Sequence, residues 1–345
     1  MGCRQSKFDA FDEPNTVDDN SQFEDNSETI DKTFLSLCSS PFEESNTLLY
    51  GTECGKIGQL NLFSKNTTPL PSSENDEVLS LIHIESKDPK VIIGTRSGSL
   101  FSLTKTTNSS ESSSNFDLTP IDKPKTHKFG VSSLIAIPTS HGGGFCSGSR
   151  DGIIKYWSNE GKLLLFSKQI NRNLITDFAV HQKDPVLFQS SEDKTIRLWD
   201  LNSFDVLRTL QDPDNHIVSS ICTVPSHPHL LASSQRGPSS CSSHLWDLRS
   251  SSLSPIRTFV SHQLSIISMS SIHPNFLVTL GRDRQLNLWS LHSSSPLSSF
   301  LVSGVPTNMV VLDNAIFVTT VDKGIHHFLI EGGMLSFEQT FNEFP

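Results

Sequence analysis

Short runs of alternating apolar and polar residues recur along the chain, each opened by a turn and closed by a large apolar side chain. The clearest extends from Ser190 to Asp200, where Asp193-Lys194 has a turn composition and β-forming residues then alternate with polar ones. The pattern is repeated at three further places, Asp151–Trp157, Asp283–Trp289 and the less regular Leu245–Asp247. This alternation predicts β-strands, each entered through a tight turn.

The copies recur at a nearly constant spacing. The four tryptophans that close them are separated by 42, 47 and 43 residues: Trp157, Trp199, Trp246 and Trp289. At a similar spacing, three further copies have another apolar residue in place of tryptophan: Leu60, Leu103 and Phe328. The spacing therefore predicts seven repeats that fill the chain. A unit of this length buries its apolar face by stacking against its neighbours.

Repeats of this length with Trp-Asp endings resemble the WD-repeat family, in which each repeat corresponds to a four-stranded blade of a β-propeller. The resemblance implies an all-β, seven-bladed WD-repeat β-propeller over residues 32–344. The expected blade limits are Lys32–Pro71, Ser72–Ile121, Asp122–Gln169, Ile170–Leu210, Gln211–Val260, Ser261–Val302 and Ser303–Phe344. We expect Leu335–Phe341 to form the outer strand of the last blade, so that the N-terminal segment is not needed to close the ring.

Residues 1–31 differ in composition from the repeats. The first 32 residues contain nine acidic and three basic side chains, and therefore −6 of the net charge of −10. Because residues 8–31 are polar and lack periodicity, we expect a disordered acidic N-terminal tail. The remaining 313 residues carry only −4 and show no basic stripe, which argues against nucleic-acid binding.

The first six residues fit the Met-Gly-x-x-x-Ser pattern of N-myristoylation, with Gly2 as the acceptor once Met1 is removed. One myristoyl chain binds a bilayer weakly and reversibly, so stable anchoring needs a second signal. The tail has acids rather than a polybasic segment, which leaves Cys3 as a site of S-palmitoylation. We therefore expect a protein attached to a membrane through Gly2 and Cys3. The alternative is a chance motif with Cys3 as a free thiol.

The rest of the composition indicates a cytoplasmic protein without a cofactor. The six cysteines are scattered and include no C-x-x-C pair, which argues against a zinc ribbon or a disulfide framework and favours a reducing compartment. The chain has no run of about 18 apolar residues and no signal-peptide pattern, so neither a membrane span nor secretion is expected. We expect no metal, no cofactor and no small-molecule substrate.

Two repeats contain the residue types of a hydroxyl–His–Asp catalytic triad. They are His127, Ser147, Asp151 and Trp157 in the third repeat and His262, Thr279, Asp283 and Trp289 in the sixth. In WD-repeat proteins such residues resemble a buried structural tetrad, in which the Asp accepts a hydrogen bond from the His, and the hydroxyl and indole hold the imidazole. Their recurrence at the repeat spacing favours this structural interpretation. The glycine run His141–Gly144 has no accompanying G-x-S-x-G elbow, so we expect no enzyme.

Loops at the two rigid faces of a propeller suit the binding of several proteins. We therefore expect a non-enzymatic, membrane-anchored scaffold that binds proteins through the faces of its ring. The alternative is a substrate receptor of a cullin ubiquitin ligase, because Trp246–Arg249 resembles the W-D-x-R ending of WD-repeat receptors. In that case Arg249 would contact the ligase adaptor.

Non-consensus pieces of the chain resemble a ciliary group within the WD-repeat family. They are Met1-Gly2 with Gln5–Lys7, Arg172-Asn173 with Thr176 ahead of Ser191–Asp200, Leu245–Arg249 and Gly324–His326. The acidic tail and the Ser-rich loops depart from that group. The resemblance implies a role in cilium assembly and ciliary protein trafficking, at the cilium or its base.

Overall fold

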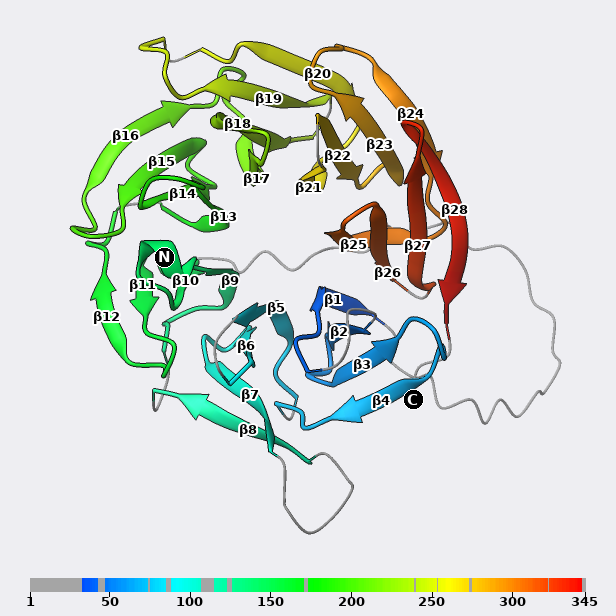
Figure 1. Cartoon of the computed structure of the whole chain (residues 1–345). Coiled ribbons are helices and arrows are strands. Elements are labelled where there is room, and N and C mark those ends of the chain that lie inside the picture. Colours follow the sequence, from blue (N-terminus) through cyan, green and yellow to red (C-terminus); the bar gives the residue numbers. More distant parts are fainter. Residues whose placement is uncertain are drawn as a thin grey trace, which may run out of the picture. The chain divides into compact units, whose positions relative to one another are not determined.

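Twenty-eight strands, β1 to β28, form seven four-stranded sheets in the part of the chain that the computed structural model describes (Figure 1). The described residues are 33–42, 47–73, 75–84, 88–106, 115–122, 126–170, 173–238, 240–252, 254–272, 275–321 and 323–342. The chain divides into two units, Met1–Ile30 and Asp31–Pro345, and all described strands belong to the second. The expected tail and the lipidation sites Gly2 and Cys3 lie outside the described residues.

The first four blades each consist of four consecutive strands. Blade one contains β1 (Phe34–Ser39), β2 (Thr47–Thr52), β3 (Ile57–Asn61) and β4 (Thr67–Leu70). Blade two contains β5 (Val78–Ile84), β6 (Lys90–Thr95), β7 (Leu100–Thr106) and β8 (Asn115–Ile121). Blade three contains β9 (Val131–Ala136), β10 (Phe145–Ser149), β11 (Ile154–Trp157) and β12 (Leu163–Phe166), and blade four contains β13 (Ile175–Val180), β14 (Val186–Ser191), β15 (Thr195–Asp200) and β16 (Val206–Gln211).

The last three blades follow the same plan. Blade five contains β17 (Ile217–Val224), β18 (His227–Arg236), β19 (Cys241–Asp247) and β20 (Arg257–His262). Blade six contains β21 (Ile266–Ile272), β22 (Phe276–Gly281), β23 (Gln285–Ser290) and β24 (Pro296–Leu301), and blade seven contains β25 (Val305–Leu312), β26 (Ala315–Val321), β27 (Gly324–Glu331) and β28 (Met334–Phe341). A single 3₁₀ turn, η1 (Thr139–His141), is the only helix among the described residues, and no described helix is long and apolar enough to cross a membrane.

The expectation of seven all-β blades is confirmed. Two outer strands extend past their expected limits, since β16 ends at Gln211 and β20 at His262. The reason is strand pairing, because Gln211 still pairs with Thr195 and His262 with Cys241. His262, expected at the start of blade six, therefore lies on the last strand of blade five.

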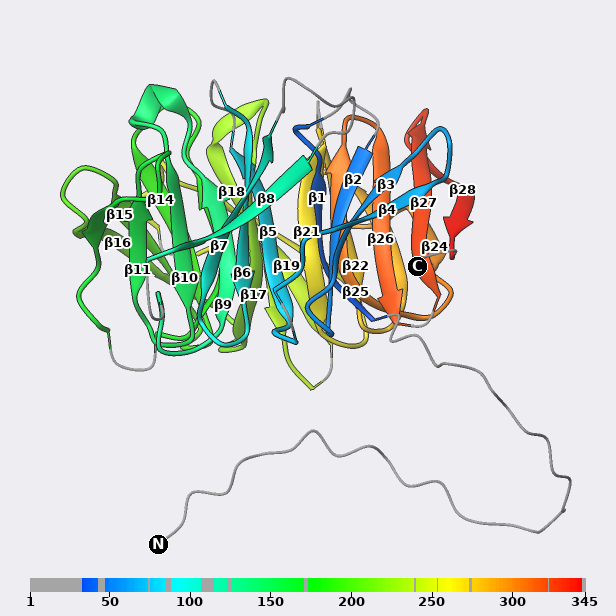
Figure 2. The ribbon, with the colours of Figure 1, turned by 90° about the horizontal axis from the view of Figure 1, so that it is seen from below.

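The seven sheets are arranged radially. The first strand of each blade lies nearest the axis of the ring, and the fourth lies at its rim (Figure 1). Viewed from the side, the strands run between two opposite faces (Figure 2). Because neighbouring strands in each blade are antiparallel, the turn between the second and third strands lies at the face where the chain enters the first strand. The turn between the third and fourth strands lies at the other face.

The apolar core consists of seven clusters, each shared by two neighbouring blades. In every cluster, the residue that closes the third-strand pattern packs toward the preceding blade. These anchors are Leu60, Leu103, Trp157, Trp199, Trp246, Trp289 and Phe328, and none is more than 2% exposed. Full burial of a large apolar side chain contributes about 1.5–3 kcal/mol. The blades are therefore stabilised mainly by contact with one another.

Blade seven closes on blade one without exchanging a strand. Its outer strand is β28, which begins at Met334 and pairs with β27, as expected from the sequence. Phe34 and Tyr50 of blade one share a cluster with Phe317 and Phe341 of blade seven. Thr307 Oγ1 also donates to the carbonyl of Phe34 at 2.5 Å across this seam. Side-chain packing and hydrogen bonds therefore close the ring.

Hydroxyl groups on the inner strands tie neighbouring blades together around the axis. In five of the seven blades, a hydroxyl donates to a backbone carbonyl of the next inner strand, at distances of 2.5–3.1 Å. The donors are Ser36, Ser80, Ser132, Thr176 and Thr307, and the acceptors are the carbonyls of Val78, Val131, Ile175, Val218 and Phe34. This belt fixes the spacing of the inner strands, and therefore the positions of the loops at both faces.

Candidate functional site

The structure brings the four candidate residues of blade three together. His127 lies on the loop before β9, and its Nδ1 is 3.0 Å from Asp151 Oδ2 on the β10–β11 turn. Its Nε2 is 2.8 Å from Ser147 Oγ on β10. Trp157 Nε1, on β11, donates to the same hydroxyl at 2.9 Å. The four side chains form one continuous hydrogen-bonded network from the turn to the core.

Blade six repeats this network with threonine as the hydroxyl. His262 Nδ1 is 3.0 Å from Asp283 Oδ1, its Nε2 is 2.8 Å from Thr279 Oγ1, and Trp289 Nε1 donates to Thr279 Oγ1 at 3.0 Å. Glycine is required beside it, because a Cβ on Gly281 would lie only 2.3 Å from both His262 Nδ1 and Asp283 Oδ1. Such a contact is too short for any side chain.

Neither network has the access that a catalytic triad needs. The residues Ser147 and Thr279 are 0% and 1% exposed, and the imidazole side chains of His127 and His262 are 0% and 1% exposed. Each hydroxyl oxygen also accepts the indole N–H of the adjacent tryptophan. A substrate therefore cannot reach either hydroxyl, and the geometry matches a structural network rather than a nucleophile with its base.

The carboxyl groups of these networks have a lowered pKa. Burial by itself raises the pKa of Asp151 and Asp283, but hydrogen bonds from the paired histidine and from backbone amides outweigh it. The amides belong to Lys128 and Ile153 in blade three and to Gln263 and Gln285 in blade six. Both carboxylates are therefore held in their ionised form, where they can accept all of these bonds.

Tryptophan anchors occur only where the second strand supplies an acceptor. The four indole N–H groups donate to Ser147, Gln189, Ser233 and Thr279 at 2.9, 3.2, 2.9 and 3.0 Å. In blades one, two and seven the anchors Leu60, Leu103 and Phe328 have no side-chain N–H, and the corresponding second-strand positions hold Tyr50, Ile93 and Val318. The polarity of the second strand thus follows the chemistry of the anchor, because a buried donor needs a partner.

Blades four and five also have buried polar networks, which were not predicted from the sequence because they lack the His–Asp pair of the tetrads. In blade four, Asn173 Oδ1 accepts from Gln189 Nε2 at 2.7 Å and from Arg197 Nη1 at 2.9 Å, and Arg197 also pairs with Asp193 at 2.5 Å. In blade five, Gln235 and His244 meet two carboxylates of the loop before β17. The strand register makes Gln189 equivalent to Ser147 and Thr279 of the tetrads, which is the positional signal that the sequence contained.

A set of arginines recurs at equivalent positions on one face of the ring. In each of five blades, the residue after the second strand donates its backbone N–H to the residue that precedes the inner strand. These donors are Glu53, Arg96, Arg150, Glu192 and Arg282, and the acceptors are Thr33, Glu77, Gly130, Leu174 and Ser265. Arg236 of blade five ends its second strand opposite Ile217 in the same way. We call the face that carries Arg96, Arg150, Arg236 and Arg282 the arginine face.

The arginines are partly or largely exposed to solvent. The side chains of Arg96, Arg150 and Arg236 are 65%, 58% and 39% exposed. Glu192 Oε1 accepts from Arg150 at 2.6 Å and from Arg236 at 2.7 Å, so one carboxylate is shared by two guanidinium groups from different blades. Within the described residues, Arg282 is exposed and makes no ion pair. Arg96 pairs with Glu77 at 2.6 Å, so the unpaired positive charge of this set comes from Arg282 and from the sharing of Glu192 by two arginines.

Arg249 lies at the opposite face, where the W-D-x-R ending places it after β19. Its guanidinium forms a bidentate pair with Asp247, with Nε to Oδ1 at 3.0 Å and Nη2 to Oδ2 at 2.8 Å. The Arg249 side chain is 68% exposed. These hydrogen bonds lower the pKa of Asp247 to about 2. Arg249 is therefore accessible, but its hydrogen-bonding edge is already occupied by its own chain.

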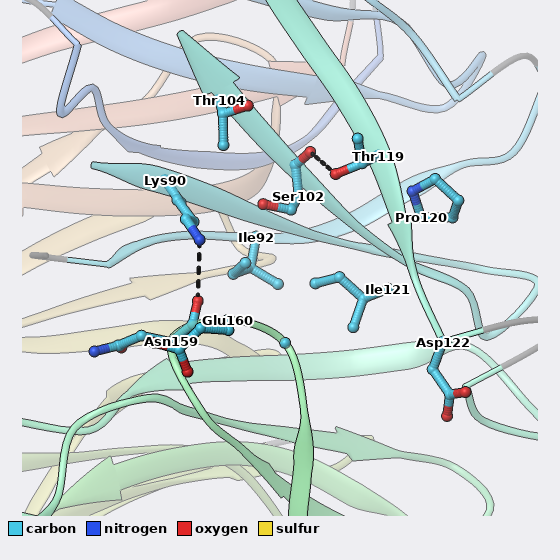
Figure 3. Close-up of a pocket in the computed structure, with 11 residues that line it drawn as sticks. Lys90, Ile92, Ser102, Thr104, Thr119, Pro120, Ile121, Asp122, Asn159 and Glu160 are labelled. Carbon is cyan, nitrogen blue, oxygen red and sulfur yellow. Dashed lines mark hydrogen bonds between the residues drawn. The ribbon is translucent and has the colours of Figure 1, made fainter. Parts of the chain in front are cut away.

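Two polar cavities complete the surface. One, of about 260 Å³, lies between β6–β8 of blade two and the β11–β12 turn, where Lys90 Nζ donates to the Asn159 carbonyl at 3.3 Å (Figure 3). The other, also about 260 Å³, lies on the axis between the inner strands. Asp177 faces it and accepts from Ser220 at 2.7 Å, and burial raises the pKa of this carboxyl. No histidine lines either cavity, so neither contains the hydroxyl–His pair of the two networks.

We predict that Asp283→Ala lowers the melting temperature at pH 7. The change leaves His262 and two backbone amides without their acceptor, and each unpaired buried donor costs about 1–3 kcal/mol. Because the folded pKa of Asp283 is lowered, its contribution is complete above the unfolded pKa of about 3.9 and is lost as the pH falls below it. The difference between wild type and variant should therefore narrow in acid, as measured by thermal unfolding between pH 7 and pH 3.

Asp205→Ala provides the control, because Asp205 is an exposed aspartate in the β15–β16 turn. It should change stability by no more than about 0.5 kcal/mol at any pH. An unchanged melting temperature for Asp283→Ala at pH 7, or a difference that does not depend on pH, would contradict the structural role of the network.

Comparison with known proteins agrees with this geometry. The family model described as "WD domain, G-beta repeat" matches residues 118–158 and 166–200, which end at the anchors of blades three and four. Among solved structures, the WD40 β-propeller domain of Doa1 superimposes with a TM-score of 0.69 at 18% identity, over 85% of this chain and 91% of that one. The designed protein Ika8 superimposes with a TM-score of 0.64 at 17% identity, over 89% and 87%.

Curated relatives match part of the chain. Nuclear distribution protein PAC1 of Arthroderma otae is 30% identical over 172 residues, Protein SOF1 of Saccharomyces cerevisiae 24% over 189, and Protein SPA1-RELATED 3 of Arabidopsis thaliana 25% over 161. These alignments cover 46%, 48% and 45% of this chain but only 35%, 37% and 18% of those proteins. The seven sheets make this chain a seven-bladed β-propeller, and the family model identifies WD40 repeats within residues 118–158 and 166–200.

Proposed function

We propose that this protein is a non-enzymatic scaffold that binds an acidic segment of a partner protein on the arginine face. The observation that carries the proposal is the recurrence of exposed arginines at one equivalent position in four blades. Guanidinium groups bind carboxylates through paired hydrogen bonds, and arginine is frequent among the residues that dominate interface energies. An acidic segment crossing this face would meet several of them in succession.

Exposed apolar side chains at the same face support a protein partner. Phe129, on the loop before β9, is 51% exposed, and Leu264, on the loop before β21, is 44% exposed. A combination of aromatic and apolar groups with arginine is typical of protein interfaces. The positions are also rigid, because backbone hydrogen bonds hold the turns to the inner strands. Little conformational entropy is therefore lost when a partner binds.

The proposal includes attachment to a membrane through a myristoyl group on Gly2 and a palmitoyl group on Cys3. It is supported by the Met-Gly-x-x-x-Ser pattern and by the adjacent thiol. The protein would then be cytoplasmic and peripheral at a membrane. The non-consensus pieces of the sequence resemble those of WD repeat-containing protein 31. On that basis we propose a place at the cilium or its base, in cilium assembly and the trafficking of ciliary proteins.

Charge reversal tests the arginine face. We expect the amount of partner protein that co-purifies with the variant Arg96→Glu/Arg150→Glu/Arg282→Glu to be at least tenfold lower than with wild type, because the introduced carboxylates repel an acidic segment. Its melting temperature should stay close to that of wild type, since these side chains are exposed. Quantitative mass spectrometry of affinity-purified material measures the loss.

The matched control reverses three lysines at the other face. Lys65, Lys162 and Lys183 are exposed and lie in the β3–β4 turn, the β11–β12 turn and the β13–β14 loop. Lys65→Glu/Lys162→Glu/Lys183→Glu changes the net charge by the same amount and should retain the partners. Partners kept by the arginine variant but lost from this control would place the binding surface at the opposite face.

Membrane fractionation tests the anchor separately. Wild type should sediment with membranes, Gly2→Ala should be soluble, and Cys3→Ser should be intermediate, because one acyl chain gives only reversible binding. Mass spectrometry of the N-terminal peptide identifies the attached groups. A wild-type protein that is wholly soluble and has an unmodified amino terminus contradicts the membrane anchor. That result would not bear on partner binding at the arginine face.

The second candidate, a substrate receptor of a cullin ubiquitin ligase, is favoured by the exposure of Arg249 at the end of blade five. The same co-purification experiment distinguishes this candidate from the scaffold. A ligase adaptor that is recovered with wild type and lost with Arg249→Ala supports this candidate. Loss of partners only with the arginine-face variant supports the scaffold.

A further inference from the structure

Blade five has an unusual polar cluster at the place where blades three and six have a single His–Asp pair. The cluster contains two carboxylates, two imidazoles and one amide: Asp212, Asp214, His216, Gln235 and His244. The first three lie on the loop between β16 and β17, Gln235 lies near the end of β18, and His244 lies on β19. We refer to these five residues as the blade-five cluster.

The potential ligand atoms of the cluster converge. One atom from each of Asp212, Asp214 and His216 lies within 4.8 Å of the others. From the opposite side, His244 Nε2 is 3.3 Å from Asp214 Oδ2 and 3.7 Å from Asp212 Oδ1. The loop therefore brings two oxygen ligands and one nitrogen ligand together, and the sheet places His244 Nε2 beside the two carboxylates. Cysteine takes no part in the cluster.

The negative charge of the cluster is not balanced. The side chains of Asp212 and His244 are each 1% exposed, and Asp214 is 49% exposed. No lysine or arginine in the described part of the chain pairs with either carboxylate. In blade four, by contrast, Arg197 neutralises Asp193 directly. Burying a carboxylate without a cationic partner is unfavourable, so a bound cation would stabilise the cluster.

Gln235 marks the position that a cation would take. Its Nε2 lies 3.0 and 3.1 Å from the two Asp212 oxygens, 2.8 Å from Asp214 Oδ2 and 2.8 Å from His244 Nε2. An amide nitrogen has two protons, which cannot satisfy two carboxylates and an imidazole nitrogen together. Gln235 Oε1 separately accepts the backbone N–H of Ser242 at 3.0 Å. The amide nitrogen is thus a weak substitute for a divalent ion.

We propose that blade five binds one divalent transition-metal ion of the zinc class through Asp212, Asp214, His216 and His244. Two imidazole nitrogens and two carboxylate oxygens suit tetrahedral Zn²⁺, with metal–ligand distances of about 2.0–2.2 Å. Mg²⁺ and Ca²⁺ take oxygen ligands and more of them, so this set disfavours both. Ligand atoms around a tetrahedral ion with such bonds lie about 3.4 Å apart, close to the 3.3 and 3.7 Å that separate His244 Nε2 from the two carboxylates. Binding requires the Gln235 amide nitrogen to move aside, because it lies among these atoms.

The ion would have a structural role. Blade five has no aspartate in the turn that follows its second strand, whereas blades three, four and six have Asp151, Asp193 and Asp283 there. In those blades the aspartate connects the turn to neighbouring residues of the network. In blade five the metal would make the equivalent connection, between the loop before β17 and strand β19. With four protein ligands, the ion has no open position for catalysis.

Calorimetric titration of the intact, tag-free chain with Zn²⁺ tests the proposal, after removal of metals with a chelator and in a buffer that does not bind zinc. We expect one site per chain, an increase in melting temperature on adding Zn²⁺, and no competition by Mg²⁺ or Ca²⁺ at millimolar concentration. Co²⁺ in place of Zn²⁺ should give the visible absorption of a tetrahedral site. A wild-type chain that binds no Zn²⁺ overturns the proposal.

Variants locate the ion. Asp214→Asn should weaken Zn²⁺ binding at least tenfold, and because Asp214 is half exposed, the apo chain should still fold. His244→Gln should abolish binding. The control His262→Gln alters the related network of blade six and should keep full stoichiometry. His227 and His229 form a second histidine pair, on β18, so binding that is lost with His227→Gln but not with Asp214→Asn reflects an adventitious ion only and overturns the proposal.

Discussion

The ring depends on the contact that each blade makes with the one before it. A large side chain of every third strand, from Leu60 to Phe328, packs toward the preceding blade, and each apolar cluster belongs to two blades. No blade has a core of its own, so the seven sheets fold as a unit. The hydroxyl belt on the inner strands supplements this packing near the axis. Because the closing contact between blades seven and one is of the same kind, the ring needs no exchanged strand.

The positions of buried polar groups inside the ring depend on which residue serves as the anchor of each blade. A tryptophan brings a buried N–H that needs an acceptor, and the second strand supplies one in all four cases. In blades three and six that acceptor also holds a histidine, which holds an aspartate, so the resemblance to a catalytic triad is a by-product of burial. The chemistry that remains accessible is on the faces. There the turn after each second strand presents one residue, and in four blades that residue is arginine.

Much of the fold could be predicted from the sequence, because the repeat spacing and the anchors set the number and order of the blades. The tetrads of blades three and six were predictable because both follow the family pattern. The arginine face was not predicted, since its successive members are 54, 86 and 46 positions apart in the chain and the net charge does not reveal that they lie on one face. The blade-five cluster was missed because Asp212 and His244 come from different elements and match no metal-binding motif. Comparing equivalent positions among the repeats would have revealed both.

A double-mutant cycle on Trp246 and Ser233 tests most directly whether the anchors determine the polarity of their surroundings. Ser233 is hydrogen-bonded to the indole N–H at 2.9 Å and is 2% exposed. Ser233→Ala should lower the free energy of unfolding by about 1–3 kcal/mol, because it leaves that N–H unpaired. In a Trp246→Phe background, the same substitution should change stability by less than about 0.5 kcal/mol. Equal effects of Ser233→Ala in the two backgrounds would contradict the account.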